Sequence, residues 1–338
     1  MVTRLTAEAF WEQSQGRALV DVRAPKEYRK GHIPNAQNLP LFTDEERATV
    51  GTLYKRVGRE VAFLRGLDII GPKMSGYVKA AARLSPQRKL FLHCWRGGMR
   101  SESVAWLLKM AGFSLYVLEG GYKAYRQMIR RDFAKPLQLL ILGGATGSGK
   151  TEILHSLRSM GEQVIDLEQL AKHKGSAFGH LGQGKQPSVE QFENELHAQL
   201  SSLDSTKRIW IEDESYALGR LFIPQEFWQH MTKAPKVLLD LPIENRLNRL
   251  VREYAHFPIQ EAQEAFARIQ RRLGGQHYKA ALEALEREDF REAARISLVY
   301  YDKAYAYSLT KQPNPLIQLP YSSNNTQQIA KQLIGLTL

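Results

Sequence analysis

The sequence predicts an α/β protein with two domains, because apolar runs typical of buried strands lead into loops and then into segments of helical spacing. In the first half, the apolar run 89–92 leads through a polar loop into 101–110, where apolar residues recur at helical spacing. In the second half, 137–142 leads through a glycine-rich turn into another helical pattern. A chain of 338 residues is long enough for two domains, each with its own core. We expect them to span 1–135 and 136–338, the second ending in a mostly helical part.

The composition is that of an ordinary water-soluble protein, with 43% hydrophobic and 24% charged residues. No apolar run approaches the length of a membrane span, and the N-terminus lacks the basic-then-apolar pattern of a signal peptide. The single cysteine allows no internal disulfide and favours a reducing compartment. These features predict a cytoplasmic protein without a membrane partner, and a monomer is the default expectation.

The net charge of +12 is unevenly distributed along the chain. Residues 1–135 contain 24 Lys and Arg against 12 Asp and Glu, whereas the remainder contains 23 of each kind. The excess positive charge of the first domain favours a polyanionic partner such as RNA. A basic surface kept for solubility is the alternative explanation.

Cys94, the only cysteine, lies in the loop that follows the first of these strands. The N–H groups of this loop and the N-terminus of the next helix should face the sulfur, which stabilises an anion and lowers the pKa of a thiol. Arg96 and Arg100 add positive charge nearby. We therefore predict Cys94, Arg96 and Arg100 as catalytic residues, although free cysteine is often only a small buried hydrophobic residue.

Segments on either side of Cys94 resemble the signature of rhodanese domains. Upstream, 21–23 reads Asp-Val-Arg, 27–28 reads Glu-Tyr and 31–34 reads Gly-His-Ile-Pro. Downstream, 119–122 reads Glu-Gly-Gly-Tyr. The resemblance implies a rhodanese-like domain with a central parallel sheet, whose loop cysteine carries a transferable chalcogen anion within a ring of N–H groups.

The same loop permits another interpretation. A cysteine separated by five residues from Arg100 and Ser101 is also the pattern of a phosphatase loop, in which a thiolate attacks a phosphate held by an arginine. A phosphatase further needs a carboxylic acid near the leaving group, and no residue of the sequence stands out in that role. The upstream signature favours chalcogen transfer, and the phosphatase remains an alternative.

The second domain begins with a phosphate-binding loop. Residues 144–151 read Gly-Ala-Thr-Gly-Ser-Gly-Lys-Thr, between an apolar strand and a helical pattern, which is the context that this motif requires. Its N–H groups can wrap a diphosphate or triphosphate, its lysine reaches the terminal phosphates and its threonine can ligate Mg²⁺. The fold class is therefore that of a P-loop NTPase-like α/β domain. The predicted phosphate-binding residues are Gly144, Gly147, Ser148, Gly149, Lys150 and Thr151.

Acidic residues follow two further strands of this domain. The apolar run 209–211 ends in Glu212 and Asp213, and we expect one of them to hold a metal through water. The predicted magnesium residues are Thr151 and Asp213.

Three more residues are candidates on the phosphate side of this site. Asp166 and Glu168 follow a short strand, and Arg246 lies on the helix after another core strand. In small nucleotide kinases a similar region closes arginines over phosphates, so a kinase is a rival interpretation.

The chain as a whole resembles the tRNA 2-selenouridine synthase family. A rhodanese-like domain fused to a phosphate-loop domain is an uncommon pairing. Two further segments carry the resemblance: 166–179, Asp-Leu-Glu-x-Leu-Ala-x-His-x-Gly-Ser-x-Phe-Gly, and 210–215, Trp-Ile-Glu-Asp-Glu-Ser. The resemblance to this family covers nearly the whole chain.

The resemblance implies an enzyme that replaces the sulfur of 2-thiouridine, at the anticodon wobble position of tRNA, with selenium from selenophosphate. It also implies that geranyl diphosphate first alkylates this sulfur, which becomes a better leaving group. On this hypothesis the loop 144–151 binds the diphosphate and Cys94 receives or presents selenium. The expected partners are tRNA, selenophosphate and geranyl diphosphate, with Mg²⁺ possible and no tightly bound cofactor.

Two other interpretations stay open. One is a sulfurtransferase or phosphatase with a regulatory nucleotide-binding domain. The other is a small-molecule kinase with an inactive rhodanese-like module. The intact Cys94 loop argues against the latter, and the basic first domain argues mildly against the former.

Overall fold

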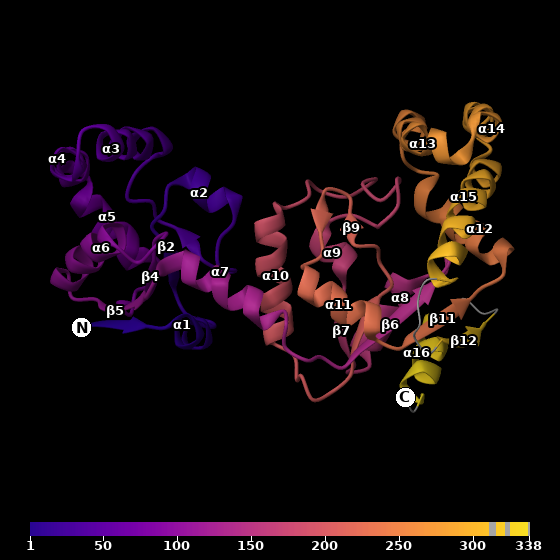
Figure 1. Cartoon of the computed structure of the whole chain (residues 1–338), viewed down its shortest axis with the longest axis horizontal. Helices are drawn as coiled ribbons and strands as arrows, with labels where there is room; N and C mark the ends of the chain where they lie inside the picture. The colour runs from indigo at the N-terminus through magenta and orange to yellow at the C-terminus, as the bar shows by residue number, and fades with distance from the viewer. Residues whose placement is uncertain (311–315, 322–324, 337–338) are drawn as a thin grey trace. The chain divides into compact units, whose positions relative to one another are not determined.

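A computed structural model describes residues 1–310, 316–321 and 325–336 of the chain (Figure 1). It contains two units, which are treated separately below. The first is Met1–Phe133 together with Glu193–His197, and the second is Ala134–Phe192 together with Ala198–Leu338. Both are α/β structures with parallel sheets, as predicted. No helix in the part of the chain that the structure describes is long and apolar enough to cross a membrane.

The first unit is built on a parallel sheet in the order β1-β5-β4-β2-β3. Its strands are β1 (Val2–Leu5), β2 (Leu19–Asp21), β3 (Gln37–Asn38), β4 (Lys89–His93) and β5 (Ser114–Leu118). The central strand β4 is buried from Leu90 to His93, so both of its faces are covered. A strand of this kind needs a continuous apolar run, which is why the sequence shows no alternation here.

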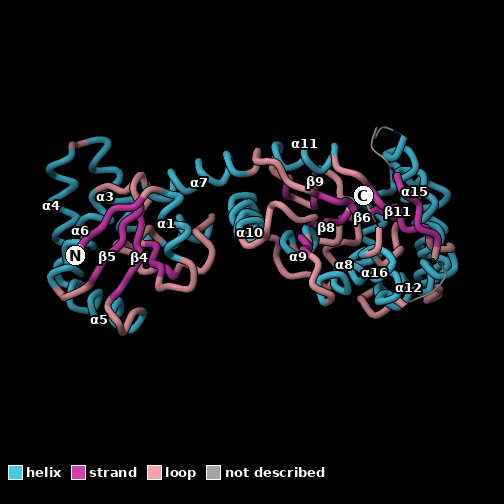
Figure 2. The backbone as a smooth tube through the Cα atoms, turned by 90° about the horizontal axis from the view of Figure 1, so that it is seen from below, coloured by secondary structure: helices cyan, strands magenta, loops and turns pink. Residues whose placement is uncertain are grey.

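Helices cover both faces of this sheet (Figure 2). They are α1 (Ala7–Ser14), α2 (Pro25–Lys30), α3 (Asp44–Arg56), α4 (Arg59–Ile70), the 3₁₀ helix η1 (Gly71–Lys73), α5 (Met74–Leu84), α6 (Met99–Met110) and α7 (Gly121–Asp132). Leu90 and Leu92 pack in one core with α5 and α6. Phe91 points to the opposite face, where its ring meets Phe10 of α1 edge to face, with centroids 5.4 Å apart.

Two residues of the rhodanese signature form a buried ion pair at the end of β2. Arg23 and Asp21 are 1% and 0% exposed, and Arg23 Nη2 lies 2.6 Å from Asp21 Oδ2. The same Nη2 donates to the carbonyl of Gly31 at 2.6 Å, and the guanidinium lies over the Tyr122 ring at 3.9 Å. These contacts join β2 to the turn before β3 and to α7. The signature therefore stabilises the frame around the cysteine loop.

The second unit has a parallel sheet in the order β12-β11-β6-β8-β7. Its strands are β6 (Leu139–Gly144), β7 (Gln163–Ile165), β8 (Ile209–Glu212), β11 (Lys236–Asp240) and β12 (Leu316–Pro320); β9 (Ala217–Leu218) and β10 (Leu221–Phe222) form a small antiparallel pair. The chain leaves β6 toward β7 on one side and later returns to β11 on the other. Ligands of such sheets bind at the carboxyl end of the strand where the order reverses, which here is β6.

The helices of this unit fall into two groups. They are α8 (Lys150–Ser159), α9 (Leu167–Ala171), α10 (Val189–Ser201, of which 193–197 belong to the first unit), α11 (Gln225–Lys233), α12 (Ile243–Tyr254), α13 (Ile259–Leu273), α14 (Gly275–Glu286), α15 (Phe290–Thr310) and α16 (Thr326–Ile334). α8 and α16 pack against the sheet in one apolar core. α13, α14 and α15 pack on one another around a second core, which is the predicted helical part (Figure 1).

We expect acid to destabilise the first unit through His93 of β4. This side chain is fully buried, 3.8 Å from Asp21, and burial lowers its pKa to about 4. An unfolded histidine titrates near pH 6.5, so between these values only the unfolded chain takes up the proton. The contribution to stability is therefore complete above pH 6.5 and is lost as the pH falls toward 4. At pH 5 the free energy of unfolding should be lower by about 2 kcal/mol, measured by urea unfolding at pH 7 and pH 5.

The matched control is His93→Phe, which keeps an aromatic ring between Phe10 and Tyr122 but cannot titrate. It should lose most of the difference between the two pH values. An equal pH dependence in both proteins would show that His93 is not the responsible group.

Candidate functional sites

The Cys94 loop, residues 94–98, connects β4 to α6 and is held by the start of α7. The Tyr122 N–H donates to the Cys94 carbonyl at 2.8 Å, and the Lys123 N–H donates to the Trp95 carbonyl at 3.0 Å. The N–H groups of residues 95–98 have no hydrogen-bond partner within the described ranges. The loop is therefore a set of free donors at the end of a buried strand, which is the requirement for an anion site.

Two glycines allow the Cys94 loop and the start of α7 to lie in close contact. Gly97 and Gly121 have φ of +68° and +61°, in the left-handed region. A Cβ on Gly121 would lie 2.5 Å from the Cys94 carbonyl oxygen and 2.6 Å from the Gly97 nitrogen. A larger residue at position 121 would push α7 away from the loop. This contact explains the glycine pair in the Glu-Gly-Gly-Tyr segment.

The Cys94 side chain is buried at the base of the loop, at 3% exposure. Its Sγ lies 3.2 Å from Ser101 Oγ, and this hydroxyl donates to the Gly98 carbonyl at 3.0 Å. In the thiol form the sulfur can donate to the hydroxyl, and in the thiolate form the hydroxyl can rotate and donate to the sulfur. Ser101 thus contacts the reacting atom, and it was not among the predicted site residues although it ends the phosphatase-type pattern.

The two predicted arginines occupy different environments. Arg100 makes a two-pronged ion pair with Glu27, with Nη1–Oε2 at 2.6 Å and Nη2–Oε1 at 3.3 Å. Burial alone would raise the pKa of Glu27, but the Arg100 hydrogen bond and charge outweigh it and leave that pKa lowered. Arg96 is exposed, and no ion pair to it is found among the residues described. Its charge is free to meet an incoming anion, whereas that of Arg100 is compensated.

The phosphate loop connects β6 to α8 with the expected backbone. Gly147 and Gly149 have φ of +83° and +80°, and Lys150 begins α8. Lys150 Nζ donates to the Gly144 carbonyl at 3.2 Å, so its ammonium lies over the loop. Ser148 is 1% exposed, and its Oγ lacks a partner within the described structure. The loop presents its N–H groups, one ammonium and the N-terminus of α8 to a ligand.

Three glutamates form a connected group next to Thr151, of which Glu212 is buried and Glu168 and Glu214 are half-buried. The Thr151 hydroxyl donates to Glu168 Oε2 at 3.0 Å, and the Glu168 N–H donates to Glu212 Oε1 at 2.8 Å. Burial raises the pKa of Glu168 against the opposing charge of Lys150. Burial, reinforced by neighbouring carboxylates, raises the pKa values of Glu212 and Glu214 well above the usual range. The raised pKa values lessen the repulsion that these acids would exert on a bound phosphate.

Asp213, predicted together with Thr151 to hold Mg²⁺, has its carboxylate engaged by other side chains. Its Oδ1 lies 2.6 Å from the buried Lys236 ammonium, and Tyr305 donates to its Oδ2 at 3.0 Å. Lys236 comes from β11, 23 residues further along the chain, so no local pattern indicates this pair. The carboxylate that contacts Thr151 is that of Glu168. Across residues 1–310, 316–321 and 325–336, no group of three or more His, Cys, Asp or Glu side chains is arranged to hold a metal ion.

The remaining candidates stabilise the surroundings of the loop. Asp166 caps α9 by accepting from the Gln169 N–H at 2.7 Å. Arg246 pairs with Asp302 at 2.7 Å and donates to the Thr146 carbonyl at 3.1 Å, so it braces the loop.

Arg249, one turn further along α12, also lies beside the phosphate loop. A Cβ on Gly149 would lie 2.5 Å from Arg249 Nη1, so the guanidinium packs directly on the loop. The Arg249 Nε has no hydrogen-bond partner in the described part of the chain. Arg249 also pairs with Glu152. The three-residue spacing from Arg246 on one helix is the signal that points to it.

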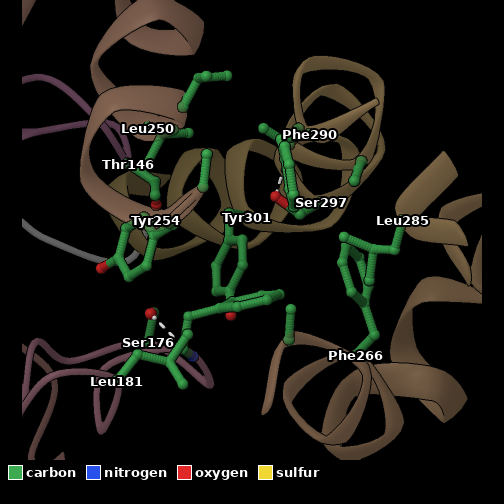
Figure 3. A pocket seen from close by; sticks show the side chains of 16 residues that line it. Thr146, Ser176, Leu181, Leu250, Tyr254, Phe266, Leu285, Phe290, Ser297 and Tyr301 are labelled. Atoms are coloured by element: carbon green, nitrogen blue, oxygen red, sulfur yellow. Dashed lines mark hydrogen bonds between the residues drawn. The ribbon is translucent and has the colours of Figure 1, made fainter. Parts of the chain in front are cut away.

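An apolar pocket borders the phosphate loop (Figure 3). Its volume is about 610 Å³ including the part open to solvent. Thr146 of the loop lies on one side of the view and Phe266 and Leu285 on the other, with Tyr301 between them. Helices α12 to α15 and the segment 176–181 supply the rest of the wall.

Three of the polar side chains of this wall, Ser176, Ser297 and Tyr301, are already engaged within the chain. The Tyr301 hydroxyl accepts from the Ala177 N–H at 3.0 Å, and Ser297 donates to the Ala294 carbonyl at 2.8 Å. Ser176 Oγ accepts from the Phe178 N–H at 3.2 Å. The pocket therefore suits a hydrocarbon better than a group that needs hydrogen bonds.

Comparison with protein-family models assigns both units. Residues 137–333 match the model described as the tRNA 2-selenouridine synthase AAA domain. Residues 6–128 match the rhodanese-like domain. The fold class predicted for each half of the sequence is thus confirmed.

Curated relatives match over most of the chain. The tRNA 2-selenouridine synthase of Chromohalobacter salexigens is 35% identical, over 88% of this chain and 89% of that protein. The proteins of the same name from a Sulfurovum species and from Shewanella loihica are each 36% identical, over 90% of this chain and 89% and 90% of their own lengths. On this similarity, together with the fold and the two anion sites, the chain belongs to the tRNA 2-selenouridine synthase family.

Proposed function

We propose that this protein is a tRNA-modifying transferase that replaces the sulfur of wobble-position 2-thiouridine with selenium, through an S-geranyl intermediate. The observation that carries the proposal is the apolar pocket beside Thr146. A phosphate loop next to such a pocket fits a diphosphate ester with a hydrocarbon chain. This pairing favours geranyl diphosphate over a nucleotide, whose base would need hydrogen-bond partners.

In the first step, the sulfur of 2-thiouridine attacks the carbon that bears the diphosphate. A carbon–sulfur bond forms, and the carbon–oxygen bond breaks with its electron pair going to the diphosphate. Negative charge therefore grows on the leaving group, where the loop N–H groups and Lys150 stabilise it. Thr151 and Glu168 are the pair that would contact Mg²⁺ accompanying the diphosphate, because Lys236 neutralises Asp213.

In the second step, selenide from selenophosphate attacks C2 of the alkylated uridine. A carbon–selenium bond forms and geranylthiol leaves. Alkylation has removed the negative charge that the departing sulfur would otherwise carry. The Cys94 loop binds the selenium donor, since its free N–H groups and Arg96 can bind an anion.

A product assay should distinguish the roles of the two sites. The full-length protein is incubated with tRNA containing 2-thiouridine, geranyl diphosphate and selenophosphate, and the digested nucleosides are identified by mass spectrometry. Lys150→Ala should slow geranylation by at least roughly a hundredfold, because it removes a charge from the leaving diphosphate. Cys94→Ala should accumulate the S-geranyl nucleoside without selenium. Lys207→Ala, an exposed lysine 73% accessible, is the control expected to match wild type. Unchanged nucleosides with wild-type protein would refute the proposal.

Filling the pocket should weaken binding of the geranyl chain alone. Ala294 of α15 lines the pocket and is half-buried, so Ala294→Phe adds a ring to the cavity without replacing a core residue. We expect the Kd for geranyl diphosphate to rise at least roughly tenfold, since each methylene kept out of an apolar site forfeits about 0.8 kcal/mol. The Kd for inorganic diphosphate should change less than roughly twofold, because that ligand lacks the chain.

Isothermal titration calorimetry with both ligands checks this prediction. Lys150→Ala is the matched comparison and should weaken both ligands. Equal affinities of wild type and Ala294→Phe for geranyl diphosphate would show that the chain binds elsewhere.

A further inference from the structure

The Cys94 loop offers several hydrogen-bond donors at once. In a trans peptide the N–H points opposite to the preceding carbonyl. Because the Cys94 and Trp95 carbonyls point to α7, the N–H groups of Trp95 and Arg96 point away from it. With those of Gly97 and Gly98, four N–H groups are unpaired in the described structure, beside the free charge of Arg96. Several donors around one anion match a group with several charged oxygens, such as a phosphoryl group.

Electron accounting favours reaction at phosphorus. The selenium of selenophosphate is at the oxidation level of selenide. Moving it onto a thiolate as a perselenide would leave an electron pair on phosphorus, giving phosphite, or would require an oxidant. Attack of the thiolate on phosphorus requires neither, because selenide leaves with the electron pair of the phosphorus–selenium bond.

The groups around the loop fit this leaving group. Glu27 pairs with Arg100 at 2.6 Å, and this pair lowers the pKa of Glu27, so that its carboxyl is a poor proton donor. His93 is fully buried at the end of β4, and its Nε2 has no hydrogen-bond partner within the described residues. An alkoxide leaving group would need an acid here. Hydrogen selenide is a much stronger acid than an alcohol, so its anion leaves without one.

We propose that Cys94 is a nucleophile toward the phosphorus of selenophosphate and forms an S-phosphocysteine. The sulfur–phosphorus bond forms, the phosphorus–selenium bond breaks, and selenide departs for the tRNA. Water then attacks phosphorus, phosphate is released and the thiolate is regenerated. No redox partner is involved. The inference rests on the proposed function in one respect, the choice of selenophosphate as the donor.

Ser101 is a positioning residue in this scheme. Its hydroxyl lies 3.2 Å from Sγ and can donate to the thiolate that leaves in the hydrolysis step. Ser101→Ala should therefore slow breakdown of the intermediate more than its formation. A purely structural role would lower both steps together.

The test uses the full-length protein, selenophosphate labelled with ³²P, and no tRNA. The reaction is quenched in acid after seconds, and protein-bound label is counted. Selenium and a phosphoryl group add nearly the same mass, so the phosphorus label decides between them. Wild type should carry label, Cys94→Ala should carry none, and Ser101→Ala should hold it at least roughly tenfold longer. Phosphorus NMR should show phosphate as the product.

Each outcome bears on the proposal. Label on Cys94 that turns over to phosphate supports it. Phosphite as the product, or selenium bound to the protein without ³²P in both wild type and Ser101→Ala, overturns it. The nucleoside assay is separate: selenium in tRNA without a labelled enzyme would leave the proposed function standing. Labelled enzyme without modified tRNA would instead refute that function alone.

Discussion

Both sites depend on N–H groups left unpaired where a buried parallel strand turns into a helix. At the end of β4 this turn is the Cys94 loop, and at the end of β6 it is the phosphate loop. A strand in the middle of a sheet is fixed by its neighbours on both sides, so the donors beyond its end are held in place before any ligand arrives. Glycines in the left-handed region, Gly97 and Gly121 in one unit and Gly147 and Gly149 in the other, allow the backbone to come close enough.

What surrounds these donors makes the two sites differ. The Cys94 loop lies beside the buried Asp21–Arg23 pair, and Glu27 compensates the charge of Arg100. A bound anion would therefore interact with the loop N–H groups and with the charge of Arg96. The phosphate loop lies near three glutamates, Glu168, Glu212 and Glu214, whose pKa values are raised. When ionised, they repel a diphosphate. The raised pKa values lessen this repulsion and the Lys150 ammonium opposes it, and the rise comes chiefly from desolvation, which no motif reveals.

Local patterns predicted the parts of these sites that are contiguous in sequence. The strand before Cys94, the phosphate loop and its helix, and the role of glycine were all readable, because they arise from neighbours along the chain. Partners from distant segments were not. Arg100 meets Glu27 across 73 residues, and Asp213 meets Lys236 from another strand. The apolar pocket was also unforeseen, since four helices and a loop must pack before it exists.

The proposed chemistry has one logic for both donors. In geranyl diphosphate and in selenophosphate the group to be transferred is bonded to a phosphoryl group, and on this proposal backbone N–H groups would bind each donor by its phosphate end. The transferred groups then need different treatment. The geranyl chain is large and apolar, so it requires a pocket, and one lies beside the phosphate loop. Selenide is a single atom with a stable negative charge, so it needs no pocket and has only to be released from phosphorus. A loop that binds the phosphoryl group and a thiolate that displaces selenide from it would release it.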